Sequence, residues 1–426
     1  MSNVQNLFSQ PTFPLPLPGQ SFFGSGSIQI FVNSGTFVTP PGVTRIRVRV
    51  WGAGGSGGVS CVTANLRLAA GGGGGGHGIK VIDTTPGTSY TVTVGAGGAA
   101  VAGSGTVSGN AGGTSSFGTA VTCTGGGAGV ANSTSSTAPL TAAGGAGGTS
   151  TGGDVNYSGG AGGLCTSTQL QGGGFTRSIA SGGGSSGSIF GNGYAGGAST
   201  VNASVSANLT CATGGGGVGG AGGAATLTSS ADWYSMGGGT FSAAEPSLSS
   251  IGAIGLAGSG FILPFKPGIP SQQTCGKIGT AGDFSSFTVV PSERYNLFYT
   301  NSNQLYASGT SGYSSGYFVG SYPNGAYSRF PGDILISKAG GGNAVANIMV
   351  DGCGFSGSTV ATGETTAAKI AGAFGGGGGT ADVSNNGVLG AQGSIGGGGG
   401  GTAGRNSTDT GTYSGAGGSG MVVVEW

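Results

Sequence analysis

The chain has 426 residues, of which 105 are glycine, 6% are charged and 36% are hydrophobic, and its formal net charge is +1. So little charge with so many apolar groups excludes a solvated disordered chain, and the absence of proline between Pro139 and Pro246 excludes collagen. The basic residues are scattered, whereas a nucleic-acid-binding protein gathers them on one face.

Residues 1–27 are rich in Phe, Pro and Ser. The alternate prolines Pro14, Pro16 and Pro18 favour an extended path, so this segment is predicted to be an anchoring arm. It has neither a basic start nor a continuous apolar stretch, and no run of eighteen apolar residues occurs anywhere in the chain. We therefore expect neither an export signal nor a transmembrane helix.

A β region is predicted after the arm, with strands within residues 27–32, 35–52, 78–83 and 89–98. Arg45, Arg47 and Arg49 alternate there with Ile46, Val48 and Val50. This period of two is typical of a strand with one buried and one solvent-facing side. The arginines are accordingly interpreted as a solvated face, with phosphate binding as the alternative.

The last six residues, MVVVEW, predict another strand. An apolar strand needs a partner to bury it, and the N-terminal sheet is the expected one. The two chain ends should then lie together, where their strands form a small β-sandwich or barrel.

Between these ends, glycine arrays recur, and several have a period of three. In GGVGGAGG, Gly216–Gly223, two of every three residues are glycine. A threefold extended helix has no internal hydrogen bonds, so its backbone must pair with neighbouring segments. The arrays therefore predict a close-packed lattice of polyglycine II helices with essentially no α-helix. The occasional Val or Ala is expected to face outward or to seal an edge, and Val218 is expected to face outward.

The predicted domains follow the chain in order. They are an arm at 1–27, a β region at 28–100 completed by the strand 421–426, a glycine-rich lattice at 101–260, an aromatic-rich insertion at 261–335 and a second glycine-rich lattice at 336–420.

The insertion is distinguished by its aromatic residues, which make up 14 of the 70 residues from 261 to 330. Tyrosine and phenylalanine provide large contact areas at a low entropic cost, so this segment is the candidate binding region. Since the chain ends meet at one end of the molecule, we expect the insertion to emerge at the opposite end. The candidate contact residues are Tyr295, Tyr299, Tyr306, Tyr313, Tyr317, Phe318, Tyr322 and Tyr327. The alternative is that these aromatics build a small core of the insertion itself.

Motifs for chemistry are weak. The spacing G-x-S-x-G, which is typical of a nucleophilic serine, occurs at Gly183–Gly187 and Gly312–Gly316. Such a serine needs a base, and His77 is the only histidine of the chain. Glycoside cleavage needs two carboxylates held close together in space. The scattered acids Glu245, Asp283, Glu293 and Asp333 are interpreted as solubilising and capping residues of loops, with such a catalytic pair as the alternative. The six cysteines lack metal-ligand spacing and are expected to be buried thiols, with disulfides as the alternative. No enzymatic activity, cofactor or metal is predicted.

Four segments together carry a resemblance: GTFVTPPGVTRIRVRVWGAGGSGG, PGTSYTVTVGAGG, GGTSSFG and the terminal GAGGSGMVVVEW. They resemble the glycine-rich domain of bacteriophage tail fibres and tail-tip adhesins over roughly residues 27–240 and 371–426. Some adhesins of this kind resemble stacked polyglycine helices with receptor-binding loops at the far tip. The segment 261–330 does not match the shared pattern, so no contact residue is transferred to it.

The resemblance implies a receptor-binding protein of the virion that attaches the phage to its host. The implied partners are a bacterial surface protein, pilus or polysaccharide, and other tail proteins through the arm. A homotrimer is expected, with a monomeric cap as the alternative. The competing hypothesis is a purely structural fibre connector or tip cap.

Overall fold

The computed structural model describes residues 27–227 apart from 104, 137, 169–175 and 203–208, and residues 371–426 apart from 372, 382–388 and 405–411. It also describes the backbone of residues 233–234, 297–299, 304–307 and 317–321. All regular elements in these ranges are strands, and none is a helix, which confirms the predicted all-β class.

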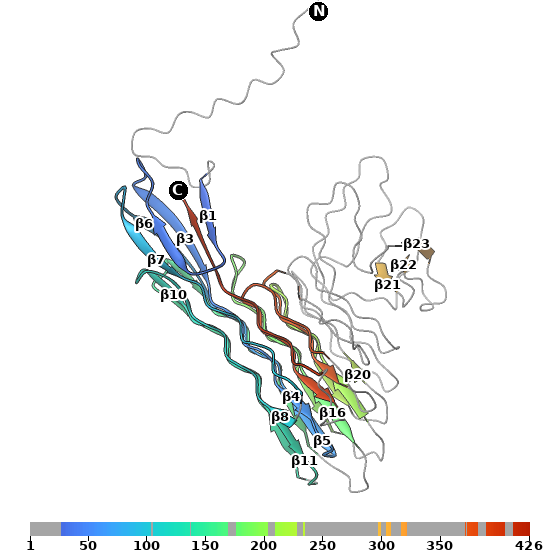
Figure 1. Cartoon of the computed structure of the whole chain (residues 1–426). Coiled ribbons are helices and arrows are strands. Elements are labelled where there is room, and N and C mark those ends of the chain that lie inside the picture. The colour runs from blue at the N-terminus through green and yellow to red at the C-terminus, as the bar shows by residue number, and fades with distance from the viewer. Residues whose placement is uncertain are drawn as a thin grey trace, which may run out of the picture.

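A sandwich of two five-stranded sheets lies at the end of the molecule that holds the C-terminus (Figure 1). The first sheet has the order β1 (Ile28–Phe31), β26 (Met421–Glu425), β3 (Arg45–Trp51), β6 (His77–Asp83) and β14 (Val155–Tyr157). The second has the order β13 (Ser150–Thr151), β10 (Val121–Cys123), β9 (Ser115–Phe117), β7 (Ser89–Thr93) and β2 (Gly35–Val38).

The sandwich core follows from the period of two in the strands. Ile46, Val48 and Val50 of β3 are fully buried, and they pack with Phe37 of β2 and Phe117 of β9 from the other sheet. The two sheets remain open, so the predicted sandwich is correct and the barrel alternative is wrong.

The two chain ends meet as predicted. β26 lies between β1 and β3 and pairs antiparallel with both, so that Ile30 is opposite Val423 and Val423 is opposite Arg49. Val422 and Val424 point to the other side and are fully buried in the core. The last strand of the chain thus completes a sheet that its first strands begin.

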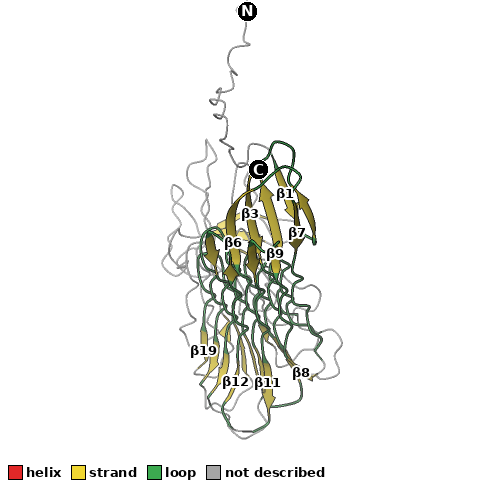
Figure 2. Ribbon diagram, turned by 90° about the vertical axis from the view of Figure 1, so that its left-hand side faces the viewer, coloured by secondary structure: helices red, strands yellow, loops and turns green. Residues whose placement is uncertain are grey.

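Extended glycine segments continue from the sandwich along the molecule (Figure 2). The segment 71–76 shows how they pair. Its N–H groups rotate among three neighbours: Gly72 and Gly75 donate to Gly399 and Gly396, Gly73 and Gly76 to Gly127 and Thr124, and Gly74 to Gly160. Its carbonyls accept from three others: Gly145 and Gly148, Gly184 and Gly187, and Gly55 and Gly52. Partners therefore repeat every third residue, and the segment is surrounded by six neighbours.

This lateral pairing is what the predicted lattice requires, because a threefold extended chain presents its amides in three directions. The name polyglycine II also specifies backbone dihedral angles, and that part of the expectation stays a prediction.

Close packing explains why side chains are missing. A Cβ added to Gly72 would lie 2.2 Å from the carbonyl oxygen of Gly55, and one added to Gly126 would lie 1.9 Å from that of Gly73. At the surface of the lattice a side chain returns at every third position: Ala143, Ala146 and Thr149 are exposed, whereas Gly145 and Gly148 are buried. The expectation that such residues face outward holds for this segment.

The expectation of an outward side chain is wrong for Val218, which is only 3% exposed. This residue follows the glycines 214–217, all of which are buried inside the stack, so the segment is not a surface segment as assumed.

Short strands form the end of the lattice away from the sandwich (Figures 1 and 2). One sheet there has the order β11 (Ala131–Thr134), β5 (Leu66–Ala69), β16 (Arg177–Ala180), β18 (Leu209–Ala212) and β20 (Trp233–Tyr234). A second has the order β12 (Leu140–Ala142), β15 (Cys165–Ser167), β17 (Ser199–Val201) and β19 (Ala225–Leu227). A third has the order β24 (Thr380–Ala381), β25 (Thr402–Gly404), β4 (Val59–Cys61) and β8 (Gly105–Val107).

These strands bury a second hydrophobic core, which includes Leu66, Leu68, Ile179, Val201 and Leu209. We call this end the distal end. The glycine lattice is therefore held between two conventional cores, which offset the high entropic cost of ordering glycine.

Candidate functional site

Four of the eight candidate aromatics lie on described backbone. They belong to a three-stranded antiparallel sheet of β21 (Leu297–Tyr299), β22 (Gln304–Ala307) and β23 (Tyr317–Ser321). Its register places Tyr306 between Phe298 and Phe318, so aromatic positions are in line across all three strands. Tyr299 is opposite Leu305, and Tyr317 is opposite Ala307.

The other four candidates, Tyr295, Tyr313, Tyr322 and Tyr327, lie outside the described residues. So do the acids Glu245, Asp283, Glu293 and Asp333. The assignment of a binding site to these aromatics therefore stays a prediction.

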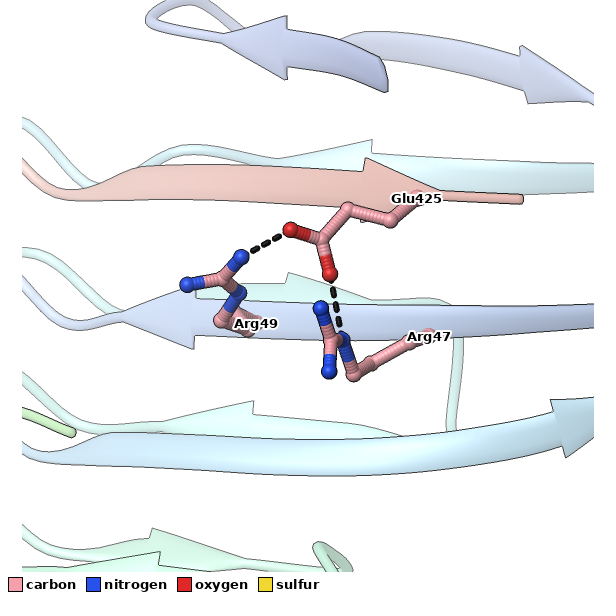
Figure 3. Close-up of polar contacts among 3 residues, drawn as sticks. All are labelled: Arg47, Arg49 and Glu425. Carbon is pink, nitrogen blue, oxygen red and sulfur yellow. Dashed lines mark hydrogen bonds and ion pairs between the residues drawn. The ribbon is translucent and has the colours of Figure 1, made fainter. Parts of the chain in front are cut away.

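Charged residues meet on the outer face of the first sheet, where Glu425 of β26 pairs with both Arg47 and Arg49 of β3 (Figure 3). The Glu425 side chain is only 5% exposed, while those of Arg47 and Arg49 are 36% and 25% exposed. Burial, followed by the neighbouring charge of Arg47, lowers the pKa of Arg49. The arginines do face away from the core, but two of them share a buried carboxylate instead of standing in solvent.

Arg45, nearer the start of β3, is the solvated member of the series. Its Nε lies 2.6 Å from Oδ1 of Asp83, and both side chains are at least half exposed. The hydrogen bond and the charge of Arg45 lower the pKa of Asp83. All three arginines thus have carboxylate partners within the chain, which favours a structural role over phosphate binding.

An aromatic stack lies where the first sheet meets the lattice. The Trp51 ring stacks on His77 at 4.2 Å between centroids and on Phe374 at 5.4 Å. His77 is fully buried, and its Nδ1 donates to the carbonyl of Val50 at 2.9 Å, whereas Nε2 has no hydrogen-bond partner. Phe374 has a φ of 63°, a left-handed conformation that is uncommon for a residue with a side chain. The stack fastens the returning chain to the base of the sandwich.

We expect this stack to make the protein sensitive to acid. Burial lowers the pKa of His77 from 6.5 to about 4, so the unfolded chain binds a proton more readily than the folded one between these values. The contribution of neutral His77 to the free energy of unfolding is therefore fully present above pH 6.5. It is lost as the pH falls toward 4, and the loss amounts to about 3 kcal/mol. Denaturant unfolding at pH 7 and pH 4.5 measures the loss.

The control is His77→Phe, which keeps an aromatic ring and removes the titrating group. This variant should lose clearly less stability than the wild type between the two pH values. His77 is the only histidine in the chain, so the variant has no histidine left to titrate. An equal loss of stability in both proteins would therefore show that other groups cause the acid sensitivity.

The serine motif at Gly183–Gly187 lies within the lattice. Ser185 is fully buried, its hydroxyl donates to the carbonyl of Gly217 at 2.9 Å, and the N–H of Tyr194 donates to Ser185 Oγ at 2.7 Å. This serine therefore satisfies the backbone of neighbouring segments, which is the role of a lattice residue. The second motif, Gly312–Gly316, lies outside the described residues.

The described cysteines behave as the predicted buried thiols. Cys61, Cys123, Cys165 and Cys211 are buried and form no disulfide. Burial raises the pKa of Cys123 to about 11 and that of Cys165 to about 12, so both stay protonated and unreactive near neutral pH. Cys275 and Cys353 lie outside the described residues.

Within the described ranges, no three His, Cys, Asp or Glu residues gather as a metal site would require. The same ranges contain no helix long and apolar enough to cross a membrane.

Two buried arginines at the distal end were not expected from the sequence. Arg67 of β5 and Arg177 of β16 are 0% and 1% exposed, and Arg67 donates to the carbonyl of Gly404. Their segments, LRLA and RSIA, are four residues long and flanked by polar or glycine-rich sequence. Such short segments contain no periodic signal that could place an arginine inside a core.

In the described residues, a β-sandwich continues into closely packed extended glycine segments, which is an all-β architecture. Residues 32–263 match the family model of the glycine-rich domain, which is more than half of the chain. The chain belongs to this glycine-rich domain family. A comparison with curated proteins finds no significant match.

Proposed function

We propose that this protein is a receptor-binding protein of a bacteriophage tail fibre or tail tip, which attaches the virion to the surface of its host. Three observations support the proposal. The sequence resembles glycine-rich tail adhesins, the chain belongs to the glycine-rich domain family, and its scaffold is extended and closely packed. The scaffold carries the most weight.

The scaffold suits a protein that must present a binding surface away from its point of attachment. The described ends of the chain, β1 and β26, pair at one end of the molecule. In the sequence, a segment rich in tyrosine stands between two glycine-rich parts. The backbone of the glycine segments is hydrogen-bonded to neighbouring segments, and the chain has few charges. We therefore expect slow proteolysis and a stability that depends little on salt concentration.

The proposal includes the partners. The arm at residues 1–27 joins the protein to other tail proteins, as a homotrimer or as a single cap, within a virion assembled in the host cytoplasm. The receptor is a surface protein, a pilus or a polysaccharide. The alternative function is a connector or tip cap without receptor contact.

Competition for adsorption tests the proposal. Purified protein is added to host cells before the phage that carries it, and adsorption is measured. An adhesin occupies the receptors and lowers adsorption, whereas a connector leaves it unchanged. Binding of the labelled protein to receptor-negative cells, at the level seen with host cells, would also contradict the proposal.

Replacing Tyr313, Tyr317, Tyr322 and Tyr327 by alanine should abolish host binding and leave the melting temperature unchanged. The physical reason is that aromatic side chains at a binding surface supply most of the contact energy without supporting the fold. Cell binding and thermal unfolding are measured on the same preparation.

The matched control is Tyr413→Ala, because Tyr413 lies on the lattice and is 42% exposed. This variant should bind like the wild type. A large drop in melting temperature of the fourfold variant would instead indicate that its tyrosines form the core of the insertion.

A further inference from the structure

Strand β1 lies at one margin of the sandwich (Figure 1). It pairs on one side with β26, and in the described part of the chain no strand pairs with its other side. A strand at the edge of a sheet presents unpaired backbone donors and acceptors, which make it a template for a further strand. The register of β1 on β26 tells which of its residues present these groups.

The backbone groups of Ile28 and Ile30 point toward the open edge. Ser27 is opposite Trp426, and the N–H of Trp426 donates to the carbonyl of Ser27 at 3.1 Å. In an antiparallel pair, residues that direct their backbone groups at the partner strand alternate with residues that direct them away from it. Ser27 and Gln29 therefore face β26 with their N–H and carbonyl groups, and Ile28 and Ile30 turn theirs outward.

The side chains at this edge are apolar and exposed. Ile28 and Ile30 are 54% and 56% exposed, and Val32, which follows the strand, is 64% exposed. Residues 27–32, SIQIFV, contain no charged residue and no proline, which are the residues that usually protect an edge strand from pairing. The open edge of β1 is therefore suited to another strand that carries aliphatic side chains.

The opposite margin of the same sheet differs. There β14 is only three residues long and follows Asp154, whose carboxylate accepts a hydrogen bond from the N–H of Val81 at 2.9 Å. A short strand beside a carboxylate is typical of an edge that does not pair further. The exposed apolar edge of β1 is thus a local feature, which favours a contact surface at this margin.

We propose that β1 pairs with β1 of a second copy of this chain, antiparallel and about a twofold axis at Gln29. In this register, Ile28 of each copy is opposite Ile30 of the other, and their outward N–H and carbonyl groups exchange hydrogen bonds. The two first sheets become one continuous sheet. The pair is a third assembly state beside the homotrimer and the single cap, and it does not depend on the proposed function, which adsorption tests separately.

Charge explains why the occupant is a second copy. A twofold contact places every residue near its own counterpart, so a charge on the strand would meet a like charge, and β1 has none. The carboxylate of Glu425 is opposite Ile28 on β26, where it pairs with two arginines. Its counterpart would be three strand spacings away, roughly 14 Å, which exceeds the Debye length of about 10 Å at 0.1 M salt.

The mass of the full chain in solution tests the pairing. Only four residues of each copy form the shared edge, so the contact is small and we expect a dissociation constant of about 10 µM. Sedimentation at about 100 µM should show most chains in pairs, and dilution to about 1 µM should return them to single chains. A single-chain mass at the higher concentration, or the mass of three chains, would overturn the proposal.

Charge exchange at Gln29 tests the position of the axis. Gln29→Lys places two ammonium groups opposite each other and Gln29→Glu places two carboxylates there, so each variant alone should pair about fivefold more weakly than the wild type. An equimolar mixture of the two variants should pair at least as well as the wild type. This rescue also shows that both variants fold. A mixture that pairs as weakly as its components would overturn the register.

Val107→Lys is the matched control. It adds the same charge to β8, an edge strand at the distal end, where Val107 is 39% exposed. Sedimentation of this variant should match that of the wild type at both concentrations. If it weakened pairing as much as Gln29→Lys does, the loss would come from added charge in general, and the contact at β1 would be contradicted.

Discussion

Deletion of residues 421–426 should abolish folding of the sandwich. β26 is the only described partner of β1 and one of the two described partners of β3, so its loss separates the two strands. The deletion also removes Val422 and Val424, both fully buried, and Trp426, which packs against the same core. Each buried valine contributes about 1.5–3 kcal/mol and the partly buried tryptophan adds to this, so the sum is a large part of the whole stability of many domains.

Near-ultraviolet circular dichroism and solubility of the shortened chain measure this effect. Glu425→Gln is the graded control, because it keeps the strand and its shape while removing the carboxylate charge shared by Arg47 and Arg49. Both arginines stay partly exposed, so the loss should be smaller than for a fully buried ion pair, on the order of 1–3 kcal/mol, and this variant should fold with lowered stability. A truncated chain that melts like the wild type would contradict the role of β26.

Gly72→Ala should destabilise the lattice by about 2 kcal/mol or more, although alanine adds only one methyl group. The new Cβ would lie 2.2 Å from the Gly55 carbonyl oxygen and 2.5 Å from its carbonyl carbon. Both atoms belong to the backbone, which cannot rotate away as a side chain can. We expect the same result at Gly377, where a Cβ would lie 1.9 Å from the Ala391 oxygen.

Gly35→Ala is the matched control for these variants. Its Cβ would meet only the Phe31 ring, at 3.6 Å, which is an ordinary van der Waals contact. The thermal unfolding of this variant should resemble that of the wild type. If Gly72→Ala and Gly35→Ala were equally stable, the close approach of glycine segments would not be what stabilises the lattice.

The assignment of binding residues shows what composition can predict. The density of aromatics at 261–330 identifies a segment that differs from the scaffold, but it does not distinguish a contact surface from a small core, because both use the same side chains. In the described part of the segment, aromatic positions align across β21, β22 and β23 through Phe298, Tyr306 and Phe318. This alignment is compatible with either role.

The partners of the charged side chains on β3 depend on contacts between residues far apart in the sequence, which no local pattern predicts. The alternation of Arg45, Arg47 and Arg49 correctly indicated an outward face of a strand. That Glu425, more than 370 residues away, pairs with two of them follows only from the register of β26 on β3. His77 likewise gave no sequence signal for its position between Trp51 and Tyr157.

The sequence by itself determined the all-β class, the lateral pairing of glycine segments and the meeting of the chain ends. These features depend on local periods: two in the strands, and three in the glycine arrays. The expectation that side chains between the glycines face outward holds for the segment 143–149, because a Cβ fits only where no neighbour approaches, but the sequence did not show which segments lie at the surface. Tertiary structure alone decided the second core at the distal end, where strands of two to four residues bury Leu66, Ile179 and Leu209. Strands this short have no period to detect, so their burial is set by which neighbours the lattice brings beside them, and the inward position of Val218 is decided in the same way.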